Sequence, residues 1–105
     1  MKVTADKELN LKASVSFQPV VASINGSKIK NYSSGIYSSS LLSSCKTDPN
    51  HWVSIVGYGA EGSKNYWKLK NSWGTKWGMN GYMLIIRKGD GEGECGIQHE
   101  GYFTR

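Results

Sequence analysis

The chain has 105 residues, a length that suits one domain with a modest hydrophobic core. It contains no apolar run of about eighteen residues that could span a membrane, and residues 1–10 lack the apolar segment of a secretory signal. Its thirteen basic and eight acidic residues give a net charge of +5, but the lysines are scattered. We expect no membrane or nucleic-acid partner, because a solvated basic surface accounts for this charge.

One helix is expected near the start of the chain. Thr4 or Asp6 can cap the free amide groups that begin a helix, and apolar residues follow at roughly helical spacing. The apolar residues expected on its buried face are Leu9, Ala13 and Val15. Residues 18–24 then form a short apolar run opened by Pro19, as at the beginning of a strand.

The next segment predicts loops, because residues 25–45 are rich in Ser, Gly and Asn. Within it we expect a turn near residues 29–32 and a brief extended piece at Ile36 and Tyr37. The serines do not form the G-x-S-x-G pattern of a serine nucleophile. This region therefore indicates no serine-type catalytic site.

Alternating apolar residues predict two strands, at 51–58 and 65–70, with turn-forming residues between them. The residues expected on the core face are Val53 and Ile55 in the first strand and Trp67 and Leu69 in the second. A third strand is expected at 81–87 and a short last one at 101–103. The sequence thus predicts one β-dominated domain with a single N-terminal helix.

Centring the hairpin between the first two strands on Glu61 places His51 opposite Asn71. The same register pairs Gly57 with Asn65, Ile55 with Trp67 and Val53 with Leu69. Directly opposed side chains lie about 4.5–5.5 Å apart at Cβ, so the Asn71 amide oxygen can accept a hydrogen bond from the imidazole. An imidazole fixed by a neutral amide can exchange a proton with a thiol nucleophile. The alternative is a structural histidine that asparagine merely satisfies.

Several motifs are similar to those of a known family. The segments "NHWVSIVGYG", "KNYWKLKNSWGTKWGMNGYM" and "ECGI" resemble the C-terminal half of papain-like cysteine peptidases. The segments "ELNLKASVSFQPVVASI" and "SSGIY" extend the resemblance over nearly the whole chain, from about Thr4 to Phe103. It implies an α+β, β-dominated fold, an open antiparallel β-barrel with short flanking helices.

The resemblance also implies roles for four residues near the predicted pair. His51 is the expected catalytic acid/base and Asn71 the amide that orients it. Trp73 is expected to cover their hydrogen bond from water, and Trp77 to shape the leaving-group side of the cleft. The alternative for both tryptophans is packing alone.

Cys45 and Cys95 are too few for a metal cluster and form no C-x-x-C motif, so no metal or other cofactor is expected. Their spacing allows one disulfide or two buried thiols. The resemblance implies the disulfide, since both match the bridge of this half of the family. The rival idea, that Cys45 is a nucleophile for His51, does not fit that match.

Glu100 falls where the family places the floor of its main specificity pocket. An acidic side chain there accepts a substrate arginine as well as apolar residues, although a solvated glutamate is the alternative. Asn50 and Ser23 are further candidate substrate-binding residues. Trp52 stands where the family usually has a small residue, so the pocket edge is expected to be partly filled. His99 is expected to be an exposed bystander.

The family's stretch with the nucleophilic cysteine and the oxyanion-hole glutamine is absent from these residues. We expect residues 1–105 to be the C-terminal half of a cysteine endopeptidase, inactive alone and active on peptides when completed by a cysteine-bearing N-terminal half. The alternative is a non-catalytic binding or assembly module derived from a truncated protease. A homodimer through the exposed cleft face is a further expectation. The family suggests a lysosomal, vacuolar or secreted location.

Overall fold

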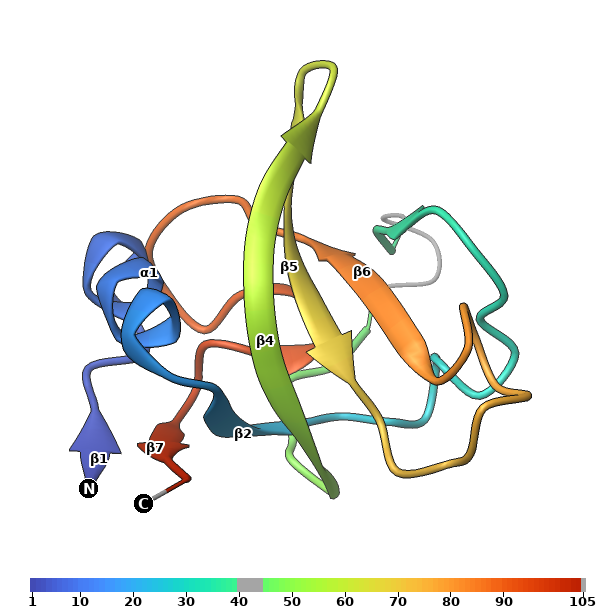
Figure 1. Ribbon diagram of the computed structural model, residues 1–105, viewed down its shortest axis with the longest axis horizontal. Helices are drawn as coiled ribbons and strands as arrows, with labels where there is room; N and C mark the ends of the chain where they lie inside the picture. The colour runs from blue at the N-terminus through green and yellow to red at the C-terminus, as the bar shows by residue number, and fades with distance from the viewer. Residues whose placement is uncertain (40–44, 105) are drawn as a thin grey trace.

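The computed structural model describes residues 1–39 and 45–104, which form one sheet flanked by a helix. The strands of these residues are β1 (Lys2–Val3), β2 (Val20–Ile24), β3 (Ile36–Tyr37), β4 (His51–Glu61), β5 (Lys64–Lys70), β6 (Tyr82–Ile86) and β7 (Gly101–Phe103). The helix α1 (Glu8–Phe17) lies beside the sheet (Figure 1), and a short 3-10 turn, η1 (Glu94–Gly96), precedes β7. The strands expected from the sequence are all present, and β1 is an addition too short to show a periodic pattern.

The sheet has the strand order β1-β7-β2-β4-β5-β6-β3 and does not close on itself. Its pairs are antiparallel except for β3 with β6, which run parallel. The long strand β4 crosses the middle of the molecule, and both chain ends lie near β1 and β7 (Figure 1). The predicted α+β, β-dominated architecture with an open sheet is confirmed.

The register predicted for the β4–β5 hairpin is wrong. Glu61 pairs with Lys64 across a two-residue turn, in which Gly62 adopts a φ of 63°. A bulge between Ile55 and Gly57 then shifts the register, so Ile55 faces Leu69. The observed partner of Trp67 is Tyr58 and that of Asn65 is Ala60, in place of Ile55 and Gly57. Apolar alternation did not reveal the bulge, because the bulge lies after Ile55 and leaves the alternation of the preceding residues unchanged.

The core faces of the two strands are nevertheless as predicted. Val53 and Ile55 in β4 and Trp67 and Leu69 in β5 are all buried. Because the bulge lies after Ile55, it does not disturb the alternation of the site-bearing half of β4. His51, at the start of β4, is therefore followed by a buried, well-packed part of the strand.

The predicted start and buried face of the helix are partly wrong. Neither Thr4 nor Asp6 caps α1; the amide of Glu8 instead donates to Asp90 Oδ1, 2.9 Å away, from a distant loop. The buried residues of α1 are Leu11 and Val15, whereas Leu9 is 76% exposed and Ala13 is also exposed. Residues four apart share a helix face, so Leu9 and Ala13 form a face of their own.

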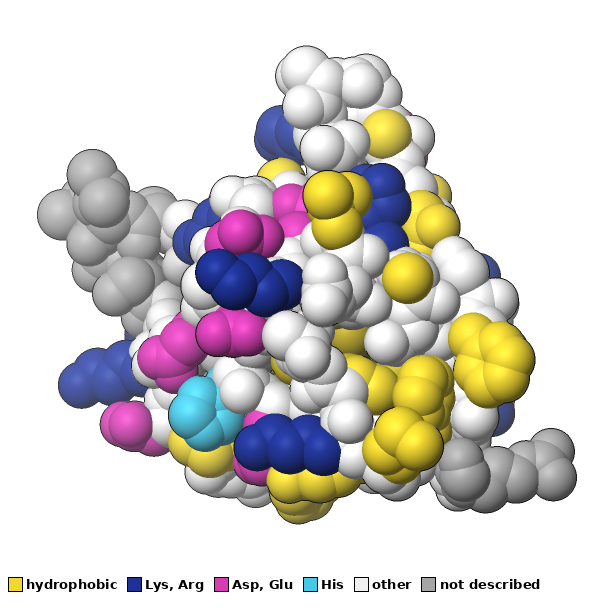
Figure 2. All heavy atoms as spheres, turned by 90° about the vertical axis from the view of Figure 1, so that its left-hand side faces the viewer, with side chains coloured by type: hydrophobic (Ala, Val, Ile, Leu, Met, Phe, Trp, Pro, Cys, Tyr) yellow, Lys and Arg dark blue, Asp and Glu magenta, His cyan; other side chains and the backbone are white. Residues whose placement is uncertain are grey.

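The exposed side of α1 belongs to a surface on which apolar and charged side chains are segregated. Figure 2 shows this face of the molecule, with hydrophobic side chains gathered on one part and acidic and basic side chains on another. Phe17 at the end of α1 is 78% exposed, and its ring contacts that of Phe103 edge-on at 5.9 Å between centroids. The inner side of the helix is held by Arg87, whose guanidinium is paired with Glu8 and donates to Gly59 O at 3.2 Å.

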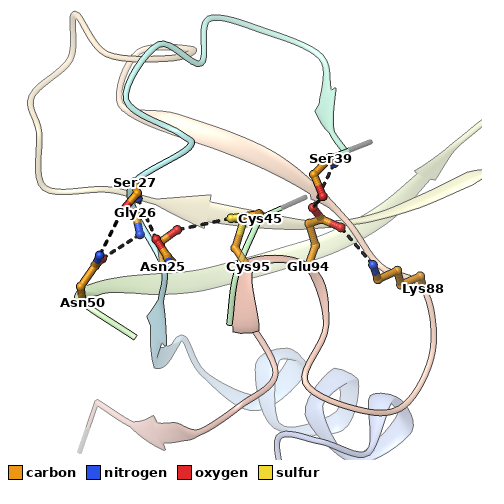
Figure 3. The surroundings of a disulfide bond; sticks show 9 residues. All are labelled: Asn25, Gly26, Ser27, Ser39, Cys45, Asn50, Lys88, Glu94 and Cys95. Atoms are coloured by element: carbon orange, nitrogen blue, oxygen red, sulfur yellow. Dashed lines mark hydrogen bonds and ion pairs between the residues drawn. A yellow bond between two sulfur atoms is a disulfide. The ribbon is translucent and has the colours of Figure 1, made fainter. Parts of the chain in front are cut away.

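The predicted disulfide between Cys45 and Cys95 is confirmed. Figure 3 shows the bridge fastening the segment before β4 to η1. Beside it, the nearly buried Glu94 accepts hydrogen bonds from the Ser39 amide (2.9 Å) and from Lys88 Nζ (3.0 Å). Burial raises the pKa of Glu94, but the hydrogen bonds from Ser39 and Lys88 outweigh burial and hold that pKa below its usual range.

Removal of the bridge should lower the free energy of unfolding by about 4 kcal/mol, because the disulfide closes a long loop in the unfolded chain. The bridged residues are 50 apart in the sequence. Guanidinium denaturation of the Cys45→Ala/Cys95→Ala variant should show this loss, and reductant should lower the stability of the original chain but not of the variant. Equal stability of the oxidised and reduced chains would contradict the prediction.

Candidate functional site

The site is built around a hydrogen bond between His51 and Asn71. His51 is the first residue of β4, and Asn71 directly follows β5. The distance from His51 Nε2 to Asn71 Oδ1 is 2.6 Å, so the predicted contact is confirmed although the predicted register is not. The bulge shifts β4 by one residue relative to the register that the turn sets with β5. This shift brings the side chains of His51 and Asn71 together.

The surroundings of Asn71 determine which way its amide faces. The backbone N–H of Ser72 donates to Asn71 Oδ1 at 2.7 Å, and the N–H of Asn71 donates to Gly81 O at 3.0 Å. A backbone N–H is only a donor, so the amide atom facing it is the oxygen. The same oxygen faces His51, and Nε2 must therefore carry a proton. In the neutral ring, Nδ1 is then the acceptor nitrogen.

One tryptophan stacks on His51, and a second supports the first. The Trp73 ring stacks on the imidazole with centroids 4.6 Å apart and an interplanar angle of 25°. Trp77 meets Trp73 edge-on at 5.4 Å, and its Nε1 donates to Ile29 O at 3.0 Å. Trp73 keeps 38% of its surface exposed. The predicted position of Trp73 over the pair agrees with these contacts, while the functional roles of both residues stay predictions.

A clamp between Asn50 and the loop after β2 fixes the chain just before His51, and sequence reasoning missed it. The Asn50 side chain accepts from the Gly26 amide at 2.8 Å and donates to Ser27 Oγ at 3.2 Å (Figure 3). A Cβ on Gly26 would lie 3.3 Å from His51 Cβ and 3.5 Å from the Trp73 ring. The glycine thus allows this close approach, where a larger residue would be tight against His51, and the "NGS" turn signal in the sequence was the available clue.

This clamp forms one wall of a shallow depression. The depression has a volume of about 320 Å³ and is lined by Gly26, Ser27, Lys30, Asn50, His51 and Trp73. Asn50 was predicted to bind substrate. Its side chain lines the depression, but its polar atoms are engaged by Gly26 and Ser27, so holding the loop is the function that its contacts support.

A second depression lies on the other side of His51. It has a volume of about 330 Å³ and is lined by Ser23, Pro49, Asn50, His51, Trp52 and Glu100. The Glu100 carboxylate accepts from Ser23 Oγ at 3.2 Å and from the Tyr102 hydroxyl at 3.1 Å. The hydrogen bond to Glu100 and the charge of that carboxylate raise the pKa of Tyr102. Both donors are uncharged, so they orient the carboxylate without neutralising it.

Trp52 lines this depression, and Tyr102 lies behind it, in contact with both Trp52 and Glu100. Trp52 is 50% exposed, and its ring lies 6.1 Å from that of Tyr102, tilted by 52°. The expectation that Trp52 partly fills the pocket edge agrees with its place in the lining. Tyr102 was not predicted as a site residue. Tyr102 lies in β7, opposite Val21 and two residues after Glu100. This position could have indicated a role at the site only once the strand pairing was known.

Other candidates lie away from these depressions. Cys45 is bonded to Cys95, so it offers no thiol to His51. His99 is exposed as predicted and pairs with Glu92 at 2.9 Å. Within residues 1–39 and 45–104, the structure has no group of three or more His, Cys, Asp or Glu residues suited to hold a metal ion. The same described residues include no helix of the length and apolarity needed to cross a membrane.

Similarity to known proteins identifies the family of the chain. The sequence profile described as "Papain family cysteine protease" matches residues 1–105. Cysteine proteinase COT44 of Brassica napus is 41% identical over 93% of this chain and 30% of its own length. The chain therefore belongs to the papain family of cysteine proteases, and it spans less than a third of the length of that relative.

Solved structures show the same fold. The proform of Amb a 11, a ragweed pollen cysteine protease, superposes with a TM-score of 0.89 at 39% identity, covering 98% of this chain and 31% of that one. Bromelain from Ananas comosus, solved with the E64 inhibitor, gives a TM-score of 0.86 at 33% identity, covering 95% and 46%. The fold class implied by the motifs is thus shared with whole proteases of which this chain matches a part.

Proposed function

We propose that this chain supplies the acid/base half of a papain-type cysteine peptidase site. His51 is the general acid/base, and Asn71 is a positioning residue that fixes its ring. The observation that carries this proposal is the hydrogen bond from His51 Nε2 to Asn71 Oδ1. This bond occupies Nε2 of the imidazole and leaves Nδ1 available for proton transfer.

The geometry supports a defined sequence of proton transfers. Among the residues that the structure describes, none is hydrogen-bonded to His51 Nδ1. Nδ1 takes the proton of a cysteine thiol, and the thiolate then attacks the carbonyl carbon of the peptide. As the C–N bond breaks, the imidazolium returns that proton to the leaving amine. Water then hydrolyses the thioester, with the imidazole accepting one of its protons.

The thiol must come from outside the 105 residues, and the family resemblance implies the same for the oxyanion-hole glutamine. Both cysteines of the sequence are in the bridge. We infer that a cysteine-bearing segment packs against the face that carries His51 and Trp73. Covering this face would also remove the exposed Trp73 ring from water, which favours such docking.

The depression at Glu100 supports a preference for cationic side chains. An arginine that enters beside Trp52 would reach a carboxylate already oriented by Ser23 and Tyr102. A planar guanidinium can pair with both carboxylate oxygens and also lie against an aromatic ring. Ser23 thereby acts through Glu100, which is the role its hydrogen bond supports.

The second candidate is a non-catalytic binding module. It is favoured by the exposure of Trp52 and Trp73 on the face beside His51, because exposed aromatic groups mark association sites. A second copy of the chain is one partner that could cover this face. Peptide hydrolysis by the completed site separates the two candidates.

A chimera tests the peptidase proposal. The N-terminal half of bromelain fused to residues 1–105 should hydrolyse a peptide substrate, and His51→Gln should lower kcat/KM by at least about 100-fold, the usual contribution of a general acid/base. His99→Gln is the matched control and should change little, because His99 lies outside the site. The chain alone should show no turnover.

Three results would contradict this prediction. One is equal activity of the two histidine variants. Another is a chimera that unfolds cooperatively, contains the disulfide and still shows no turnover. The third is turnover by the pure 105-residue chain that a thiol inhibitor stops.

Glu100→Gln in the chimera should selectively reduce cleavage of substrates that place arginine in the Glu100 depression. We expect kcat/KM for arginine relative to leucine to fall about 10-fold or more, since a hydrogen bond between charged groups contributes about 1.5–3 kcal/mol. Glu61→Gln, at the exposed hairpin end, is the matched control. An unchanged ratio would show that Glu100 does not contact the substrate.

A further inference from the structure

The sequence contains two N-x-S motifs of the kind that accept N-linked glycans. They are Asn25-Gly26-Ser27 and Asn31-Tyr32-Ser33. Such a motif can be modified in the folded protein only where the asparagine side chain reaches solvent. The two motifs lie close together in the sequence but differ sharply in their surroundings, so the structure discriminates between them.

The second motif is presented at the surface. Asn31 and Ser33 are exposed, in the loop between β2 and β3. Tyr32 between them is anchored: its hydroxyl donates to Gly35 O at 2.5 Å and accepts from the Leu84 amide at 3.2 Å. Its ring also contacts that of Trp77, with centroids 5.6 Å apart. The central residue therefore holds the loop to the sheet while its two neighbours face solvent.

The first motif is enclosed. Asn25 is only 8% exposed. Its backbone N–H donates to Cys95 O at 2.8 Å, and its side-chain Oδ1 accepts from the backbone N–H of Ser27 at 3.0 Å. Figure 3 shows Asn25 beside the disulfide, and the Cys45 sulfur lies 3.7 Å from its carbonyl oxygen. A sugar on this buried side chain would have to displace part of its surroundings.

The disulfide gives an independent indication of compartment. Disulfides persist in oxidising compartments such as the endoplasmic reticulum lumen and the extracellular space. A chain that acquires the Cys45–Cys95 bridge passes through such a compartment, and N-glycosylation motifs are used in secreted proteins. The exposed motif and the bridge thus point to the same route.

We propose that Asn31 is an N-glycosylation site and that the folded protein carries no glycan at Asn25. The donor is an oligosaccharide linked to a lipid through a pyrophosphate. A bond forms between Asn31 Nδ2 and C1 of the first sugar as the bond from C1 to the pyrophosphate oxygen breaks. Nδ2 loses one proton, and the lipid pyrophosphate leaves.

The glycosylated residue directly follows a residue that lines the candidate site. Lys30, the preceding residue, lines the same depression as His51 and Trp73. Glu100 belongs to the other depression, on the opposite side of His51. This proposal stands on the loop and the bridge and does not depend on peptidase activity.

The test uses the chain expressed behind a secretory signal in eukaryotic cells. An amidase that releases N-linked glycans should lower the mass of the secreted protein and, in ¹⁸O-labelled water, label residue 31 alone. Ser33→Ala should remove the glycan, whereas Ser27→Ala, the matched change at the enclosed motif, should leave it. The glycan is also measured on the protein in total cell extract, so a variant that fails to fold and is not secreted still gives a result.

Two outcomes would overturn the proposal. One is a secreted, disulfide-bonded protein whose residue 31 is unmodified. The other is a secreted protein labelled at residue 25, which would show that the enclosed asparagine tolerates a sugar. Peptide analysis of the protein from its natural source should show the same labelling as the secreted protein, at residue 31 alone.

Discussion

The hydrogen bond from His51 Nε2 to Asn71 Oδ1 is the interaction on which the rest of the site depends. It links the beginning of β4 to the residue after β5, so the sheet itself fixes its geometry. The Ser72 amide holds the same oxygen from the other side, which prevents the amide from turning over. A site set on paired strands in this way keeps its ring orientation without substrate, and such preorganisation lowers the cost of the chemical step.

Around this bond the chain places two different environments. On one side, Trp73 stacks on the imidazole and the clamp of Asn50 with Gly26 holds the neighbouring loop. On the other side, Glu100 presents an oriented carboxylate beside Trp52. An aromatic cover excludes water from a polar bond and so strengthens it, whereas a carboxylate in an open depression is available to a cation. The two depressions therefore differ in what they can bind.

The sequence predicted the strands of the site and their buried faces well, because Val53, Ile55, Trp67 and Leu69 alternate clearly. It did not predict the hairpin register, since a bulge adds one residue without altering the apolar pattern before it. Leu9 was misplaced because an apolar residue on a helix need not face the core. The Tyr102–Glu100 contact was missed for another reason: it depends on how β7 lies beside β2, which local pattern does not contain.

The measurement that tests this account most directly is the tautomeric state of His51, read from the ¹⁵N shifts of the imidazole by NMR in the labelled chain. The account predicts that the neutral ring carries its proton on Nε2, protected from exchange by Asn71, while the exposed His99 exchanges rapidly. A neutral His51 ring with its proton on Nδ1 would contradict the account. So would averaged shifts of a freely rotating ring, because Nδ1 would then no longer be held ready for a thiol.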